Sequence, residues 1–130
     1  SLVFTSNRGG SPQLYRIAAS GGSAQRLTFD GRYNSAADIA NKKLAFVRGN
    51  RGAFNIAIKS LNSSGADTLS NGQLDESPTL SPNGAMVAYT TLKNGDNTLA
   101  VVSDNAKARQ FLTSPVGDVR EPAWSPYLNQ

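Results

Sequence analysis

Three stretches of this chain repeat one pattern: LVFTSNRGGSPQLYRI at 2–17, LAFVRGNRGAFNIAIK at 44–59 and VAYTTLKNGDNTLAVV at 87–102. Each stretch is a short β-prone run, a turn rich in Gly or Asn, and a second β-prone run. Aromatic, polar and leucine landmarks recur in the three repeats at spacings of 42 and 43 residues. They are Phe4, Phe46 and Tyr89; Gln13, Asn55 and Thr98; and Leu27, Leu69 and Leu112. Three landmarks that share one period indicate an internal repeat.

A third run and a fourth, shorter run complete each unit. The fourth run lies within NSAADIAN at 34–41, DESPTLSPNG at 75–84 and REPAWSPY at 120–127. The first of these lacks the Ser-Pro turn, and 5 positions separate Ile39 from Leu44, against 7 between Leu80 and Val87. We therefore expect a tighter hairpin after Ile39. Helical periodicity is not convincing in any window of about 11 residues.

Four short antiparallel strands per unit of this length are typical of a β-propeller blade. The sequence therefore predicts an all-β fold, a β-propeller of three four-stranded antiparallel blades. We expect one domain over residues 1–130, with repeats at about 2–43, 44–86 and 87–127. The alternative is a β-sandwich with accidental internal similarity, although sandwich strands do not normally repeat in sets of four. The large side chains Phe4, Phe46, Tyr89 and Trp124 are expected to pack between blades.

The order of strands within a unit leaves both ends of the chain open. The run Pro78–Leu80 is short and lies between a polar loop and a Ser-Pro turn, which suits the innermost strand. On this order the chain enters on a second strand, Leu2–Ser6, and ends on an inner strand, Pro122–Ser125. A ring needs about four to eight blades, so we expect an open half of a six-bladed ring. Either the sequence is a piece of a longer propeller, or two copies close the ring by pairing Pro122–Ser125 with Leu2–Ser6.

A binding surface is expected where the loops that lead into the inner strands converge at the channel mouth. These loops are Asp30–Ser35, Asn71–Ser77 and Val116–Glu121. They supply mixed charge and one aromatic ring, and Arg and Tyr are common anchors of protein interfaces. The candidate partner-binding residues are Arg32, Tyr33, Asn34, Gln73, Asp75, Glu76, Asp118 and Arg120.

Asp75 and Glu76 have a second interpretation, in which they cap the inner strand or bond neighbouring blades. Neighbours on a strand point to opposite faces, so these two carboxylates do not form an acid/base pair.

Composition excludes several other functions. The net charge is +4, but the basic residues are scattered, whereas a nucleic-acid binder clusters them. The chain has no His and no Cys, which excludes a serine-hydrolase triad, a cysteine nucleophile and a thiolate zinc site. We expect no cofactor and no metal, and the sequence offers no apolar run of about 18 residues for membrane insertion. A non-enzymatic binding protein is favoured, and an accessory propeller segment of a hydrolase is a further alternative.

The motifs TSNRGGSPQLYRI, GGSAQRLTFDG, LDESPTLSPNG and EPAWSPYL resemble the carboxy-terminal half of the six-bladed propeller of the TolB family. The resemblance covers essentially the whole chain, but repeat one departs from the blade pattern at DIANKK, where a Pro-Asp-Gly-like turn is expected. It implies a non-enzymatic periplasmic scaffold of the Tol–Pal system. Its implied partners are the peptidoglycan-associated lipoprotein Pal and colicin peptides. The alternative is a half-propeller whose main property is symmetric self-assembly.

Overall fold

The computed structural model describes residues 2–29, 33–50 and 52–112 of the chain. These residues form eleven strands and no helix. The strands are β1 (Leu2–Ser6), β2 (Gln13–Ile17), β3 (Gln25–Arg26), β4 (Tyr33–Ala40), β5 (Lys43–Asn50), β6 (Ala53–Ser60), β7 (Asp67–Thr68), β8 (Glu76–Leu80), β9 (Met86–Lys93), β10 (Asp96–Ser103) and β11 (Arg109–Leu112).

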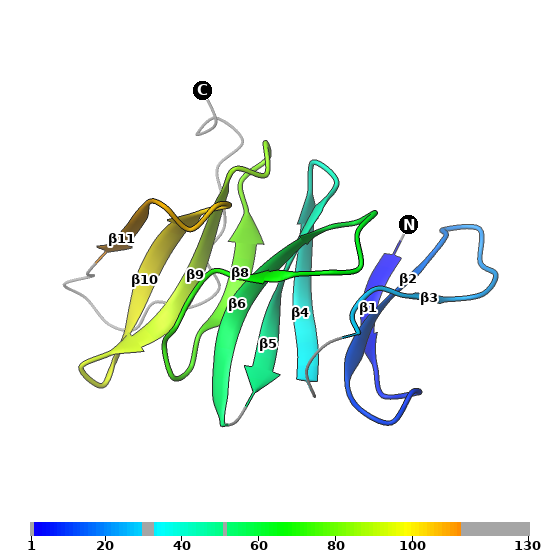
Figure 1. The fold of residues 1–130 in the computed structure, drawn as a ribbon, viewed down its shortest axis with the longest axis horizontal. Helices are drawn as coiled ribbons and strands as arrows, with labels where there is room; N and C mark the ends of the chain where they lie inside the picture. The colour runs from blue at the N-terminus through cyan, green and yellow to red at the C-terminus, as the bar shows by residue number, and fades with distance from the viewer. Residues whose placement is uncertain (1, 30–32, 51, 113–130) are drawn as a thin grey trace.

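The strands form three separate antiparallel sheets that stand side by side (Figure 1). The sheets are β1-β2-β3, β4-β5-β6-β7 and β8-β9-β10-β11, and in each the strands are neighbours in chain order. The first sheet has three strands, because no described strand precedes β1 at its inner edge. The predicted all-β propeller fold, with an open first blade, is confirmed. The predicted inner strand Pro122–Ser125 and Trp124 lie outside the described residues.

Strand boundaries differ from expectation at the inner and outer strands. β4 begins at Tyr33, two residues before its predicted run Ser35–Ala40, and β8 begins at Glu76, two residues before its predicted run Pro78–Leu80. The outermost strand is short in the first two sheets: β3 forms only two residue pairs with β2, and β7 forms two with β6. The next residue in each case still bonds to the sheet: the backbone N–H of Leu27 donates to the carbonyl of Leu14 at 2.8 Å, and that of Leu69 to the carbonyl of Ile56 at 2.7 Å.

The hairpin between β4 and β5 is tight, as the missing Ser-Pro turn predicts. Ala40 pairs directly with Lys43, so Asn41 and Lys42 alone make the turn. Both residues have positive φ, 50° and 62°, as a type I′ hairpin requires.

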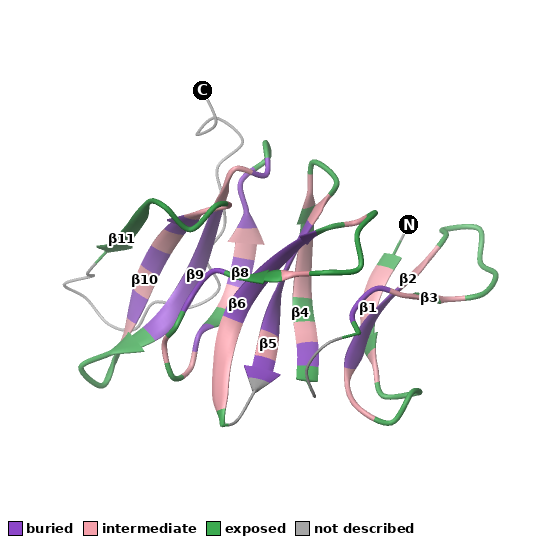
Figure 2. Cartoon of the chain, viewed as in Figure 1, coloured by how far each residue is buried: buried purple, intermediate pink, exposed green. Residues whose placement is uncertain are grey.

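The middle sheet is buried on both faces, which explains the continuous apolar run at the start of β5. Successive side chains of a strand point to opposite faces. Ala45 and Val47 therefore join one core cluster, while Leu44 and Phe46 join the other. Figure 2 shows the resulting concentration of buried residues along β5, β6 and β9, with the outermost strand β11 exposed.

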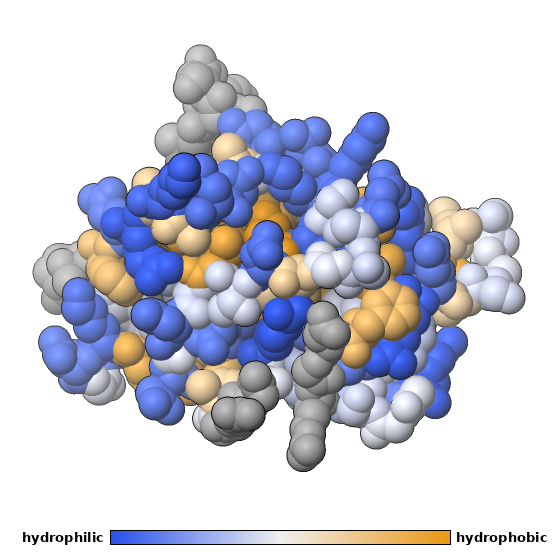
Figure 3. Space-filling view, in the orientation of Figure 1, coloured by the Kyte–Doolittle hydropathy of each residue, from blue (hydrophilic) through white to orange (hydrophobic). Residues whose placement is uncertain are grey.

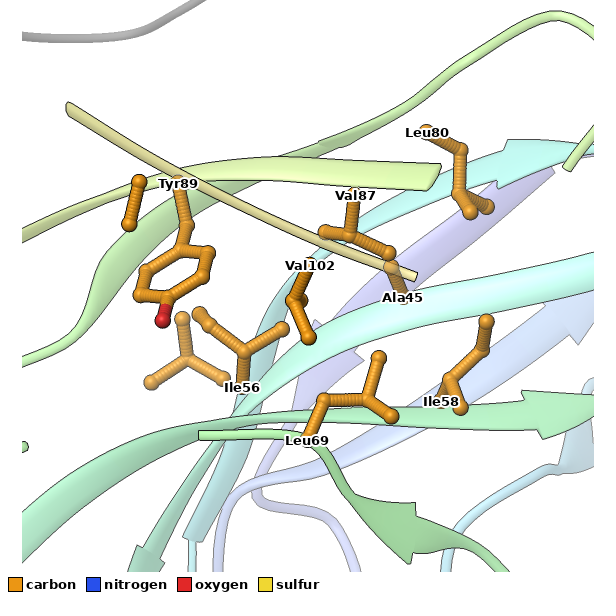
Figure 4. Packing of buried hydrophobic residues seen from close by; sticks show 10 residues of the cluster. Ala45, Ile56, Ile58, Leu69, Leu80, Val87, Tyr89 and Val102 are labelled. Atoms are coloured by element: carbon orange, nitrogen blue, oxygen red, sulfur yellow. The ribbon is translucent and has the colours of Figure 1, made fainter. Parts of the chain in front are cut away.

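The larger cluster lies between the second and third sheets. Figure 4 shows side chains of β5 and β6 meeting those of β9 and β10. Tyr89 is the largest side chain in it, and Ile56, Val87 and Val102 beside it have no exposed surface. The smaller cluster joins Leu14 and Leu27 of the first blade to the middle sheet. The predicted packing roles of Phe46 and Tyr89 are confirmed, and Phe4 stacks on Tyr15 with ring centroids 5.9 Å apart. In the space-filling view most of the visible face is hydrophilic, with apolar surface gathered near its centre (Figure 3).

Candidate functional site

The first residues of β4 and β8, Tyr33 and Glu76, lie around one pocket at the same end of the middle sheet. Phe54, in the first residues of β6, forms a parallel bridge with Leu74 in the loop before β8. The backbone N–H of Phe54 donates to the carbonyl of Gln73 at 3.0 Å, and that of Asp75 donates to the carbonyl of Phe54 at 2.9 Å. These bonds fix the loop 71–75 against β6 and so position the side chains that follow it.

Both inner strands carry a bulge at this end. The register of β4 shifts between Ser35 and Asp38, and that of β8 shifts between Glu76 and Thr79. Ala36 and Ser77 take the left-handed backbone conformation at the two bulges, with φ of 56° and 53°. A bulge bends its strand and redirects side chains. The two bulges therefore shape the same surface in successive blades.

Tyr33 and Phe54 form an aromatic pair above Gly49. The two rings meet edge to face, with centroids 5.4 Å apart and an interplanar angle of 81°. Gly49 pairs with both residues across the sheet. A Cβ atom at Gly49 would lie 2.9 Å from the Phe54 ring and 3.0 Å from Cβ of Tyr33. The absence of a side chain at Gly49 therefore allows the two rings to meet.

The aromatic pair borders a shallow pocket of about 290 Å³ between the middle and third sheets. The pocket is lined by Tyr33, Ser35, Ala36, Val47, Phe54, Leu74, Glu76 and Ser77. Its one carboxylate lies beside aromatic and aliphatic surface. Such a surface suits recognition of a peptide or protein partner, because aromatic anchors beside a few polar groups supply most interface energy.

The predicted site residues divide into exposed, buried and undescribed groups. Tyr33 is 37% exposed, and Gln73 and Glu76 are also exposed at this end of the sheets. Asn34 and Asp75 are fully buried, so their side chains do not reach the surface. The other three, Arg32, Asp118 and Arg120, lie outside the described residues.

The carboxylate of Asp75 is the centre of a buried hydrogen-bond cluster. Oδ2 accepts from Ser70 Oγ at 2.6 Å, from the backbone N–H of Gly72 at 2.9 Å and from Asn55 Nδ2 at 3.0 Å. Oδ1 accepts from Thr91 Oγ1 at 2.5 Å. The donors come from β6, from the loop before β8 and from β9, so Asp75 ties the second blade to the third. This geometry is the bonding of neighbouring blades that was the alternative interpretation of Asp75.

Asn34 takes the equivalent position one repeat earlier. Its Nδ2 donates to Gln13 Oε1 at 2.7 Å, and Thr28 Oγ1 donates to the same oxygen at 2.6 Å. Thr28 Oγ1 accepts from the backbone N–H of Leu14 at 2.9 Å, as Ser70 Oγ accepts from that of Ile56 at 2.8 Å. Hydrogen bonds between buried polar side chains thus tie the first blade to the second, as they tie the second to the third.

The sequence contains a signal for this cluster, namely polar residues that recur at the repeat spacing. Gln13 and Asn55 keep the repeat spacing although they lie within apolar strands. A polar residue that recurs at a strand's buried position needs a recurring partner. Thr28 and Ser70 keep the same spacing and supply the hydroxyl groups.

Electrostatics near the cluster act on Tyr89. Burial and the nearby Asp75 carboxylate raise the pKa of its hydroxyl, while Arg109 opposes them.

The guanidinium of Arg109 donates to the carbonyl of Leu69 and so links β11 to the middle sheet. Two further links join these blades: Lys43 Nζ lies 2.6 Å from Asp104 Oδ2, and Asp38 Oδ2 accepts from the backbone N–H of Leu80 at 2.7 Å.

Within the described ranges, Asp and Glu residues do not gather into a group of three or more that could hold a metal ion. Among the same residues, no helix is long and apolar enough to cross a membrane.

Comparison with known proteins gives consistent matches. The sequence model of the TolB beta propeller domain matches residues 1–128. The Tol-Pal system protein TolB of Xanthomonas oryzae pv. oryzae (strain PXO99A) is 50% identical over 115 residues, which are 85% of this chain and 26% of that protein. The chain therefore spans about a quarter of the length of the curated relatives it matches.

Solved structures share the fold. The crystal structure of TolB from Acinetobacter baumannii matches with a TM-score of 0.86 and 42% sequence identity, over 94% of this chain and 31% of that one. The structure of putative TolB from Agrobacterium tumefaciens also has a TM-score of 0.86, over 95% of this chain and 46% of that one, and at 16% identity it supports the fold alone. Together with the repeated blades and their recurring polar links, these matches show that the chain belongs to the TolB β-propeller family.

Proposed function

We propose that this chain is part of a non-enzymatic scaffold that binds a protein partner at the rim of the Tyr33–Phe54 pocket. The partner class is a Pal-like lipoprotein of the cell envelope, and a colicin peptide would compete for the same surface. The compartment we propose is the periplasm. The relatives at 50% identity are Tol-Pal system proteins, which supports this choice of partner.

The observation that carries the proposal is the exposed ring of Tyr33, held in a fixed position. Its edge-to-face contact with Phe54 and the glycine beneath both rings restrict its motion. A rigid aromatic side chain loses little conformational entropy when a partner covers it. Glu76 also lines the pocket and offers a carboxylate to a basic or hydrogen-bonding partner.

The full proposed contact set includes the residues named from the sequence. Tyr33, Gln73 and Glu76 contact the partner directly. Arg32, Asp118 and Arg120 belong to the same set by their position in the equivalent loops. Asn34 and Asp75 act indirectly, because their buried hydrogen bonds hold the strands that present Tyr33 and Glu76.

A binding titration tests the proposal with a matched pair of variants. Tyr33→Ala should weaken binding of the soluble domain of a Pal-like lipoprotein by about tenfold or more, because it removes the anchor ring. Ile39→Ser is the control: Ile39 is 38% exposed, as Tyr33 is 37% exposed, and lies near the other end of the same strand. Isothermal titration calorimetry would measure both. Equal losses in the two variants, or no binding by the unaltered chain, would contradict the assignment of this rim.

Symmetric self-assembly is the second candidate function, and two observations favour it. Among the described strands β1 pairs with β2 alone, so its other edge has no strand partner from that part of the chain and is the edge that a second copy would join. The outward faces of the first and third sheets also carry apolar residues, including Leu2, which is 61% exposed, and the half-buried Leu99 and Val101. Two copies joined through Pro122–Ser125 and Leu2–Ser6 would cover this edge and make six blades.

A further inference from the structure

A second pocket lies between the first and middle sheets, at the end opposite the Tyr33 rim. Its volume is about 300 Å³. It is enclosed by the ends of β2 and β6, by the short strand β3 and by the loop after β6. It is lined by Arg16, Gln25, Arg26, Leu27, Phe29, Lys59, Leu61, Asn62, Ser63 and Ser64.

Two cationic side chains reach this space from facing sheets. Arg16 lies two residues after Leu14, and Lys59 lies two residues after Ala57. Leu14 and Ala57 both belong to the core cluster between these sheets. Because side chains alternate along a strand, Arg16 and Lys59 share their faces and continue the same inter-sheet space. Both side chains thus line the pocket where the apolar core ends.

Lys59 is a buried cation without an anionic partner among the described residues. Only 4% of the Lys59 residue is exposed. Nζ donates one hydrogen bond, to the carbonyl of Ser60 at 2.8 Å. The ion pair found in the described ranges is Lys43–Asp104, which lies elsewhere. Burial lowers the pKa of Lys59 from its ordinary value of 10.5, as expected for an ammonium removed from water and not compensated by a carboxylate.

The rest of the described lining is suited to an oxyanion. It contains three basic side chains and no carboxylate. Asn62, Ser63 and Ser64 add neutral hydrogen-bond donors from the loop after β6. Phe29 is 55% exposed and, with Leu27 and Leu61, provides apolar surface beside the charged groups. An organic substituent attached to the anion could cover that surface.

We propose that this pocket binds a phosphate group, either free phosphate or a small phosphate monoester, between Lys59 and Arg16. A phosphate monoester carries between one and two negative charges at neutral pH and has three strong acceptor oxygens. These match an ammonium, a guanidinium and the neighbouring hydroxyl groups. Bound phosphate gives the buried ammonium of Lys59 an anionic partner.

A titration of the chain with inorganic phosphate tests the proposal, with chloride at the same ionic strength as the reference. Amide chemical shifts of residues 60–65 should change and saturate with phosphate, and they should not change with chloride. A parallel titration with glycerol phosphate distinguishes the two sources: tighter binding indicates a phosphorylated small molecule, and equal binding indicates free phosphate.

Lys59→Met removes the charge and keeps the apolar stem, so it should fold and weaken phosphate binding by about tenfold or more. Arg16→Gln should weaken it as well, and provides a second variant if the first unfolds. Lys107→Met, a change at an exposed lysine in the β10–β11 turn, should bind phosphate as the unaltered chain does. Unsaturable shifts, equal shifts with chloride, or unchanged affinity in both pocket variants would overturn the proposal.

Discussion

Asp75 and Glu76 are neighbours in the sequence and have opposite roles in the structure. Asp75 is fully buried and accepts four hydrogen bonds, whereas Glu76 is exposed at the pocket. Gly72 belongs to the same arrangement, since a Cβ atom there would lie 2.2 Å from Asp75 Oδ1. The backbone must approach the carboxylate this closely to donate its N–H. Two acids that are adjacent in the sequence therefore differ in burial: Asp75, in the loop before β8, holds blades together, and Glu76, the first residue of β8, is exposed.

The first prediction concerns this pair of acids. Asp75→Ala should lower the free energy of unfolding by about 2–4 kcal/mol, because several buried donors lose their acceptor at once. Glu76→Ala, at the next position, should change it by less than about 0.5 kcal/mol, since an exposed side chain is removed. Urea unfolding followed by fluorescence measures both. Similar effects of the two substitutions would show that the cluster does not stabilise the fold.

The second prediction concerns the turn between β4 and β5. Lys42 is held at a φ of 62°, whereas another two-residue turn, between β9 and β10, has Gly95 at its second position with a φ of 83°. A non-glycine residue in this conformation costs about 1–2 kcal/mol, and glycine in the unfolded chain costs about 0.4–1 kcal/mol of entropy. Lys42→Gly should therefore stabilise the chain by up to about 1 kcal/mol, while Gly95→Ala should destabilise it. A fall in melting temperature for Lys42→Gly would contradict the turn type.

The strands β5 and β6 illustrate how one strand serves two cores. Their alternate residues face different sheets, so both sets must be apolar or, where polar, must find partners. Lys59 is a buried cation at the end of β6, where the apolar core gives way to the cationic pocket. The middle sheet thus carries this buried charge at the end of β6, beside a loop rich in serine.

A pH prediction follows from that buried charge. The pKa of Lys59 is lower in the folded chain than its ordinary value of 10.5, so the unfolded chain binds the proton more tightly. Stability relative to a chain without this lysine should therefore rise as the pH increases through the folded pKa towards 10.5. In phosphate-free buffer, Lys59→Met should be at least as stable as the unaltered chain at neutral pH. Its advantage should shrink under alkaline conditions, as thermal unfolding of both chains at matched pH would show. A constant difference across that range would contradict the lowered pKa.

The three sheets together form an open stack with different surfaces at its two ends. The middle sheet has neighbours on both faces, and the first and third sheets have a described neighbour on one face only. In a ring of blades both outward faces would be covered by further blades. The exposed edge of β1 and the apolar outward faces are therefore the features through which this chain would join other propeller segments.

The assembly prediction uses that edge. If two copies close a ring, light scattering after size exclusion should give about twice the 13.7 kDa of one chain. Deletion of residues 122–130 should then restore a mass near that of one chain, because the pairing strand is lost. A single-chain mass over the whole accessible concentration range would exclude self-assembly and leave the binding proposal as it stands.

Most of the fold could be predicted from the sequence because its determinants are local and repeated. The recurrence of Phe4, Phe46 and Tyr89 at one period identified the repeat, and β-prone runs between Gly or Asn turns gave the strands. The short loop at Asn41 and Lys42 predicted a tight hairpin, and the structure confirms it. These features depend on residues near in the chain, so no long-range contact is needed to infer them.

The candidate site was predictable only in part. The sequence placed Tyr33, Asn34, Asp75 and Glu76 at one end of the inner strands, and strand alternation set Asp75 and Glu76 on opposite faces. Which face is buried depends on how the next sheet packs and on the loop 71–75, both of which are tertiary contacts. The same reason applies to Lys59: an alternating lysine is ordinary in a strand, and only the first sheet and the loop after β6 bury it. By itself the sequence determined the repeat, the strand order and the open first blade. The packing of sheet on sheet decided which polar side chains are exposed and which are buried and hold the blades together, because burial depends on residues distant in the chain.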